Sequence, residues 1–226
     1  MPTEGATERA LVVGASGGIG AALVAALPAR GAEVVPLSRR DDGLDVTDEG
    51  SVAQALGGLS GPFDKVLIAT GALSVDGHGP EKALRDLDAE GLAALFAINA
   101  MGPALMLKHL VPLIPRDRRC AIGVLSARVG SIGDNRLGGW HGYRAAKAAL
   151  NMILRGAAIE LSRSRRHAVL AALHPGTVAT PFTRDYPHHD KVPPGTAAAN
   201  LLAVLDGLTP ADSGRFMDYA GKEIPW

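Results

Sequence analysis

The chain has 226 residues, of which 47% are apolar and 20% are charged. This mixture excludes a fibre and a disordered chain, and the length predicts one domain over residues 1–226 with a full core. Basic and acidic residues balance at 23 each, so nothing indicates binding to nucleic acid or to an anionic membrane. Without an N-terminal signal core or an apolar run of membrane-spanning length, we expect a soluble, cytoplasmic protein.

Short apolar runs alternate along the chain with longer segments that carry apolar residues at helical spacing. The runs are nearly continuous rather than alternating, which predicts buried parallel strands at residues 10–13, 34–37, 66–69, 121–125 and 169–173. The longer segments predict helices at residues 19–29, 51–56, 88–113 and 143–162. This order predicts an α/β fold with a doubly wound parallel sheet of the Rossmann type in a single domain.

A glycine-rich turn directly follows the first predicted strand and opens the first predicted helix. Glycines let the backbone turn tightly and approach a ligand, and a helix N-terminus offers free N–H groups and a positive dipole to phosphate. A purely structural turn is the alternative. The pattern predicts a dinucleotide-binding site that includes Gly14, Ser16, Gly17, Gly18, Ile19 and Gly20.

Tyr143 and Lys147 stand four residues apart in the predicted helix 143–162. Residues at this spacing lie on one helix face, about 6 Å apart along the axis. There the lysine ammonium stabilises a phenolate and draws a phenol pKa of about 10 towards neutrality. A phenol tuned in this way exchanges a proton with a carbonyl or an alcohol near pH 7, which is general acid/base chemistry.

The Gly-x-x-x-Gly-x-Gly turn together with the later Tyr-x-x-x-Lys resembles the short-chain dehydrogenase/reductase family, and the resemblance covers essentially the whole chain. It implies that Asp45 and Val46 contact adenine and that Asn99 joins Tyr143 and Lys147 in the catalytic set. The family's nicotinamide-contacting Pro-Gly-x-Val-x-Thr segment is matched by Pro175, Gly176, Thr177, Val178 and Thr180. In place of the usual Asn-Ala-Gly, this chain has Ala69, Thr70 and Gly71, of which the last two are expected at the cofactor.

The resemblance also assigns roles and a branch. Tyr143 would be the general acid/base, Lys147 would lower its pKa and bind the nicotinamide ribose, and Asn99 would bend its helix and help hold a water in a proton relay to Lys147. Within the family, the chain looks most like the C-factor-like branch of small carbonyl reductases. This likeness rests on Gly-Ser-Ile at 130–132, Gly-Gly-Trp at 138–140 and the segment 218–226.

Cofactor choice is expected at the end of the second strand. An acidic residue there would bind the ribose hydroxyls of NAD and repel the phosphate of NADP. This chain has Ser38 and Arg39 instead, and a guanidinium can fork onto a 2′-phosphate. Asp41 and Asp42 could partly neutralise it, and a solvated arginine pair is the alternative. NADP(H) is favoured, and NAD(H) stays open.

The substrate-binding serine of the family has no clear counterpart. In the family pattern an apolar strand ends in Ser-Ser, and the second serine hydrogen-bonds the substrate oxygen. Here the strand 121–125 is followed by Ser126 and Ala127, so that position falls on Ala127. Because side chains alternate in direction along a strand, Ser126 replaces it only if the backbone bulges. Ser131, in the loop beyond, is the other candidate.

Other candidate residues have simpler interpretations. His188, His189 and Asp190 imitate a metal cluster, but adjacent residues rarely share one ligand sphere, so no metal site is expected. His174, at a strand end, is interpreted as a structural histidine. Trp140 either lines the substrate pocket or packs under its loop.

Two classes of function follow. The first is an NADP(H)-dependent reductase or dehydrogenase that interconverts a small-molecule carbonyl and a secondary alcohol. The second is a nucleotide-binding signalling or regulatory protein with little turnover, which the C-factor likeness and Ala127 both favour. Family members often form dimers or tetramers through long helices, for which residues 88–113 and 143–162 are available.

Overall fold

The computed structural model describes residues 7–75, 77–186 and 190–226. Within these residues, six strands form one parallel sheet in the order β2-β1-β3-β4-β5-β6. The strands are β1 (Glu8–Val13), β2 (Ala32–Leu37), β3 (Lys65–Ile68), β4 (Cys120–Leu125), β5 (Ala168–His174) and β6 (Phe216–Asp218). The strand order reverses between β1 and β3, which makes the gap between their carboxyl ends the topological switch point.

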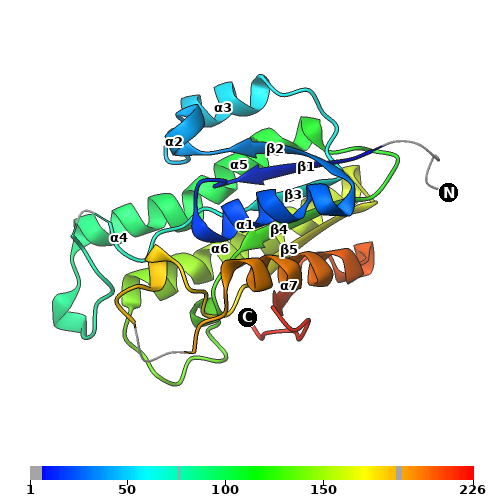
Figure 1. Ribbon diagram of the computed structural model, residues 1–226. Coiled ribbons are helices and arrows are strands. Elements are labelled where there is room, and N and C mark those ends of the chain that lie inside the picture. The colour runs from blue at the N-terminus through cyan, green and yellow to red at the C-terminus, as the bar shows by residue number, and fades with distance from the viewer. Residues whose placement is uncertain (1–6, 76, 187–189) are drawn as a thin grey trace.

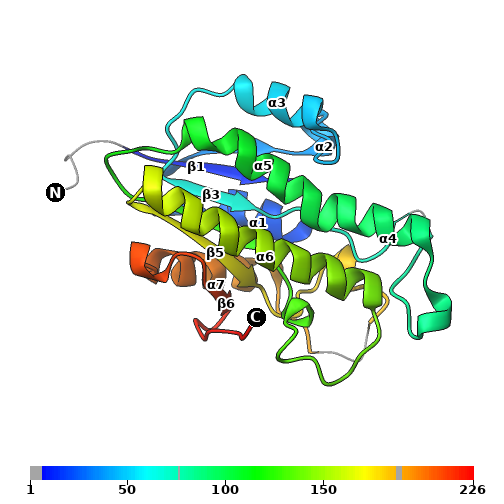
Figure 2. The same cartoon turned by 180° about the vertical axis from the view of Figure 1, so that it is seen from behind.

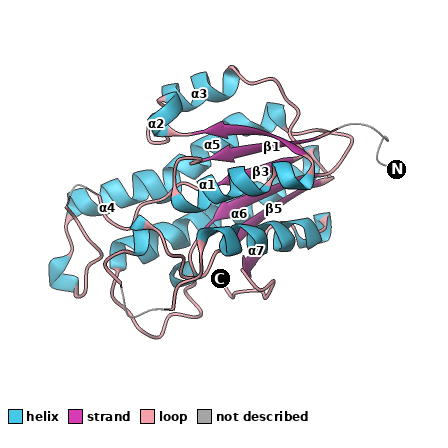
Figure 3. Cartoon of the chain, viewed as in Figure 1, coloured by secondary structure: helices cyan, strands magenta, loops and turns pink. Residues whose placement is uncertain are grey.

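Helices cover both faces of the sheet, so the predicted Rossmann-type doubly wound fold is confirmed. They are α1 (Gly18–Ala26), α2 (Arg39–Asp42), α3 (Glu49–Gly57), α4 (Ala89–Phe96), α5 (Gly102–Leu110), α6 (His141–Ser164) and α7 (Pro194–Gly207). Helices α1 and α7 pack together on one face (Figures 1 and 3), and α3, α5 and α6 lie on the other (Figure 2). Each face closes over its own apolar layer, one around Leu23 and Leu201, the other around Val66 and Leu150.

The predicted strands are confirmed, and their burial explains why they could be recognised. All residues of β3 and β4 are buried, so helices cover both faces of each strand and the sequence shows no alternation. Cys120 begins β4 and is fully buried, which raises the pKa of its thiol to about 12 because the thiolate would lose its solvation. Strand β6 and helix α7 were not predicted.

The predicted helix over residues 88–113 is one continuous helical run with a change of winding in its middle. Helix α4 passes into a π-helical turn at Ala97–Met101, and α5 then continues to Leu110. The run Ala89–Leu113 is long and apolar enough to cross a membrane by length and composition, which corrects the expectation that no such run exists. Here it packs beside α3 and α6, with Leu95, Met106 and Leu110 buried.

Candidate active site

The glycine-rich turn lies at the switch point, against the carboxyl end of β3. Gly14 has φ +84°, and a Cβ there would come within 2.9 Å of the Ala69 carbonyl. A Cβ on Gly20 would collide with the Gly14 carbonyl, so both positions need glycine. Helix α1 begins at Gly18 without a side-chain cap, which leaves its first N–H groups facing the turn. These features make a cradle suited to phosphate.

The segment after β5 closes against the same turn. A Cβ on Gly18 would collide with the side chain of Thr180, so the absence of a side chain lets the two segments touch. Gly176 adopts φ +77°. Two backbone hydrogen bonds fix the segment to Val192: the Thr177 carbonyl accepts from Val192 N, and Ala179 N donates to the Val192 carbonyl. The sheet edge that holds the glycine turn is therefore also lined by Pro175, Gly176, Thr177, Val178 and Thr180.

Thr70 and Gly71 follow β3 at this edge. The Thr70 hydroxyl is buried and has no hydrogen-bond partner among the described residues. Gly71 lies between two predicted catalytic groups, because a Cβ there would be 3.1 Å from Asn99 Oδ1 and 3.4 Å from Lys147 Nζ. An unpaired hydroxyl beside a glycine cradle fits a polar ligand such as a dinucleotide.

Ser38 and Arg39, which were predicted to choose between NADP and NAD, differ in whether their side chains are already hydrogen-bonded within the protein. Ser38 is buried and caps α2, since its Oγ accepts from Asp41 N and donates to the Asp41 carboxylate. Arg40 pairs with Asp41 at 3.0 Å, and Asp42 accepts from Ser38 N at 2.7 Å. Arg39 is exposed and forms no ion pair with a described residue. The two acidic side chains are therefore engaged elsewhere, and Arg39, which acts weakly on the Asp45 carboxylate, is exposed and available to an anion.

Asp45 and Val46 lie between α2 and α3. The Asp45 carboxylate accepts from Thr47 N and Thr47 Oγ1 at 2.9 and 2.7 Å, and these hydrogen bonds lower the Asp45 pKa. Val46 packs against the first residue of α5, where a Cβ on Gly102 would come within 2.9 Å of Val46 Cγ2. The pair is rigidly placed at the side of the switch point predicted to hold adenine.

Tyr143 and Lys147 lie one turn apart on α6, and both are buried. Lys147 Nζ donates to the Leu125 carbonyl at 3.0 Å and lies 5.9 Å from the centre of the Tyr143 ring. Burial raises the Tyr143 pKa above its ordinary value and lowers the Lys147 pKa to about 7. The expected lowering of the phenol pKa is therefore not found in the protein alone, because burial disfavours the charged phenolate.

Asn99 lies in the π-helical turn and bridges to the segment after β3. Its Nδ2 donates to the Ala72 and Leu95 carbonyls at 2.8 and 3.0 Å, and its Oδ1 accepts from Ala72 N at 3.1 Å. A π turn stands where the helix was expected to bend, and the Leu95 carbonyl accepts from the Asn99 side chain there. Asn99 thus ties the helix beside Lys147 to Ala72.

Neither candidate serine has a free hydroxyl. Ser126 Oγ donates to Asn151 Oδ1 at 2.6 Å in a buried contact, and Ser131 Oγ donates to the Pro225 carbonyl. Ala127 is half-buried between them. Sequence reasoning missed Asn151, although a signal existed: it follows Tyr143 and Lys147 at the same four-residue spacing on α6.

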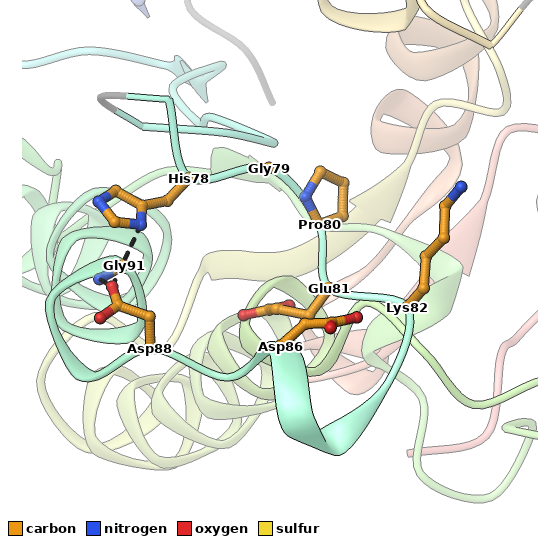
Figure 4. A pocket seen from close by; sticks show the side chains of 8 residues that line it. All are labelled: His78, Gly79, Pro80, Glu81, Lys82, Asp86, Asp88 and Gly91. Carbon is orange, nitrogen blue, oxygen red and sulfur yellow. Dashed lines mark hydrogen bonds and ion pairs between the residues drawn. The ribbon is translucent and has the colours of Figure 1, made fainter.

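Glu81 is a second residue that sequence reasoning missed. Helix α6 has no side-chain cap of its own, and Glu81 Oε2 instead accepts from Gly142 N at 3.0 Å while the Glu81 carbonyl accepts from Trp140 N. Because these partners are about sixty residues apart, no local pattern could reveal the contact. Beside them lies a cavity of about 340 Å³, where His78 faces Asp88 (Figure 4). Its described lining includes no predicted catalytic or cofactor residue.

The structure gives His174, the predicted structural histidine, no hydrogen-bond partner for its Nδ1 and no metal-binding cluster among the described residues. The His174 side chain is largely buried, which lowers its pKa to about 4. His188 and His189 lie outside the described residues. Within the described part of the chain, no group of three or more His, Cys, Asp or Glu is placed to hold a metal.

Comparison with known proteins identifies relatives along nearly the whole chain. A family model described as enoyl-(acyl carrier protein) reductase matches residues 14–215. A 1-hydroxy-2-glutathionyl-2-methyl-3-butene dehydrogenase from Rhodococcus sp. (strain AD45) is 34% identical, and the alignment covers 96% of this chain and 98% of that protein. C-signal from Myxococcus xanthus is 38% identical, with 74% of this chain and 95% of C-signal covered.

Solved structures share the fold. A short-chain dehydrogenase/reductase from Burkholderia multivorans with bound NADP has a TM-score of 0.84 at 27% identity and covers 98% of this chain and 100% of that one. The NADPH-bound carbonyl reductase from chicken fatty liver has a TM-score of 0.79 at 22% identity, and the match covers 97% of this chain and 99% of that one. At this identity the likeness shows the fold alone. From the family model and the close relatives, this chain belongs to the short-chain dehydrogenase/reductase family, as its motifs predicted.

Proposed function

We propose that this protein is an NADP(H)-dependent oxidoreductase that interconverts a carbonyl and a secondary alcohol, with Tyr143 as the general acid/base. The observation that carries the proposal is the position of Tyr143 and Lys147. They are buried one turn apart on α6, and Lys147 Nζ lies beside Gly71, at the sheet edge where the glycine turn also lies. An acid/base group therefore stands next to a dinucleotide cradle, which is the combination that hydride transfer to a carbonyl needs.

The residues at this edge fit a nicotinamide dinucleotide, which supplies the hydride when bound. Gly14 and Gly18 would hold the diphosphate, and the unpaired Thr70 hydroxyl would find a partner in the ligand. Arg39, exposed and without an ion pair among the described residues, would bind the 2′-phosphate of NADP. The NADP bound to the Burkholderia relative supports this choice.

The two buried side chains are suited to carbonyl reduction at neutral pH. Since burial raises the Tyr143 pKa, the phenol stays protonated and can donate its proton to the forming alkoxide. Lys147, with a pKa of about 7, can carry the proton that restores the phenol, and Asn99 fixes the backbone beside it. Alcohol oxidation would instead need the phenolate, which burial disfavours.

A second candidate is a nucleotide-binding regulatory protein with little turnover. Ala127 stands at the position of the family's substrate-binding serine, and the hydroxyls of Ser126 and Ser131 are engaged in other hydrogen bonds. An absent hydroxyl donor of this kind costs about 10²–10³ in rate. The 38% identity to C-signal supports this alternative.

One experiment separates the candidates. The purified protein is titrated with NADPH and with NADH, and oxidation of each is followed with a panel of aliphatic and aryl ketones and aldehydes. Tighter binding of NADPH together with turnover supports the reductase. NADPH binding with no turnover supports the regulator, and binding of neither nucleotide contradicts both candidates.

We also propose self-association through the outer surface of α6 and of the π turn that leads into α5. Met101, Met152 and Ile159 are 45%, 73% and 48% exposed, high values for large apolar side chains on helices. Light scattering of the wild type and of Met152→Glu tests this: a dimer or tetramer that dissociates in the variant is expected, and a wild-type monomer would contradict the proposal.

A further inference from the structure

Aromatic side chains from two separate segments gather on the ring of Tyr143 and its neighbour Trp140. The chain holds two Trp, three Tyr and four Phe, and four of these nine gather at this one place. We propose that Trp140, Phe182 and Tyr186, here called the aromatic wall, make the site selective for ketones and aldehydes that carry an aryl group near the carbonyl. This inference rests on the proposed function and names its substrate class.

The geometry of the aromatic wall favours ring–ring contacts. The Tyr143 ring centre lies 6.1 Å from that of Phe182 and 6.4 Å from that of Trp140, with the planes tilted by 59° and 68°. Trp140 in turn contacts Tyr186 at 5.0 Å. Tilted and edge-to-face arrangements at these separations are the ones that aromatic rings prefer. Another ring placed among them would find edges and faces to pack against.

Each side of the aromatic wall is held independently. Trp140 adopts φ +51° and ψ +40°, a left-handed conformation that is uncommon for a bulky residue, and its N–H donates to the Glu81 carbonyl. Phe182 sits in the short helical turn Pro181–Thr183, where Thr183 Oγ1 donates to the Val178 carbonyl at 2.6 Å. Backbone contacts therefore position the Trp140 ring before α6 and the Phe182 ring after β5. The left-handed conformation of Trp140, unfavourable for a bulky residue, persists in the folded protein.

The aromatic wall is the more exposed flank of a buried phenol. Tyr143 is only 5% exposed, whereas the neighbouring Phe182 is 41% exposed. A substrate whose oxygen reaches the phenol can lay its remaining atoms against this exposed ring. A saturated ring would gain burial there, and an aryl ring would gain burial and ring–ring attraction.

The test compares two ketones with the same carbon skeleton, 4-phenylbutan-2-one and 4-cyclohexylbutan-2-one, in which two methylenes insulate the carbonyl from the ring. We measure kcat/KM for both with NADPH in the wild type, Phe182→Leu and the matched control Phe182→Tyr, which keeps a ring. The wild type and Phe182→Tyr are expected to prefer the aryl ketone by about tenfold, and Phe182→Leu to lose at least threefold of that preference. Equal rates for the two ketones in the wild type, or a preference that Phe182→Leu leaves unchanged, would overturn the inference and leave the proposed function standing.

If the protein turns over neither these ketones nor any carbonyl of the wider panel, the proposed function fails and binding decides the inference. The probe is then 4-(4-fluorophenyl)butan-2-one, titrated with the NADPH-loaded protein and followed by fluorine NMR. Binding that weakens at least threefold in Phe182→Leu but not in Phe182→Tyr supports the aromatic wall. No binding to the wild type, or equal binding to all three proteins, overturns it.

Discussion

Replacing Lys147 by Met is expected to abolish turnover and yet make the folded protein more stable at neutral pH. Burial lowers the Lys147 pKa from its ordinary 10.5 to about 7. Between these two values the unfolded chain takes up a proton that the folded protein does not. Stability therefore falls as the pH drops from 10.5 to 7, and below pH 7 the cost stays constant.

The expected gain follows from this shift. At pH 7 the buried lysine costs the folded state about 4 kcal/mol, at 1.36 kcal/mol for each pKa unit. Methionine removes that cost but also removes the hydrogen bond from Lys147 Nζ to the Leu125 carbonyl, a loss of about 1–2 kcal/mol. The variant should thus be more stable by about 2–3 kcal/mol at pH 7, with no advantage left near pH 10.

Urea unfolding of both proteins at pH 7, 8.5 and 10, at one protein concentration, measures the difference. The reasoning is refuted if Lys147→Met is less stable than the wild type at pH 7, or if the difference between the two does not shrink as the pH rises. NADPH oxidation measured on the same samples tests the expected loss of turnover.

Three further predictions concern the cofactor, the helix start and the substrate oxygen. Arg39→Ala should raise the KM for NADPH by about 10- to 150-fold and that for NADH little, since a charge-assisted hydrogen bond is worth about 1.5–3 kcal/mol. Equal effects on the two would remove Arg39 as the selector. Glu81→Ala should lower the free energy of unfolding by about 1–2 kcal/mol because Gly142 N loses its acceptor, whereas Glu81→Gln, which keeps an acceptor, should cost less; equal costs would argue against the cap. Ala127→Ser should raise kcat by about tenfold if a hydroxyl is what the site lacks, and an unchanged kcat would mean that the substrate oxygen is held in another way.

The strands and the motif positions could be predicted because local sequence determines them. A buried parallel strand such as β4 is apolar at every position, and a phosphate-binding turn needs glycine wherever a Cβ would strike the backbone, as at Gly14. Since parallel strands place their carboxyl ends at one edge, the motif residues that follow β1, β3 and β5 lie together at that edge. The short β6, with three residues, carries too little pattern to be recognised.

The remaining features depend on contacts between distant segments. Glu81 caps α6 from another part of the chain, and Phe182 reaches Tyr143 from beyond β5. The direction of the Ser126 side chain was also beyond sequence reasoning, because it depends on how β4 ends against Asn151. The pKa of Tyr143 shows the same limit, since burial decides its direction and burial belongs to the whole fold.

The most direct test of the proposed role of Tyr143 compares the wild type, Tyr143→Phe and Tyr219→Phe. The second variant removes a phenolic hydroxyl from a half-exposed tyrosine after β6. We measure kcat for NADPH-dependent reduction of 4-phenylbutan-2-one, and NADPH affinity by fluorescence titration. We expect Tyr143→Phe to lose at least a hundredfold in kcat while binding NADPH as the wild type does, and Tyr219→Phe to keep its activity. A Tyr143→Phe variant that turns over at the wild-type rate would contradict the account.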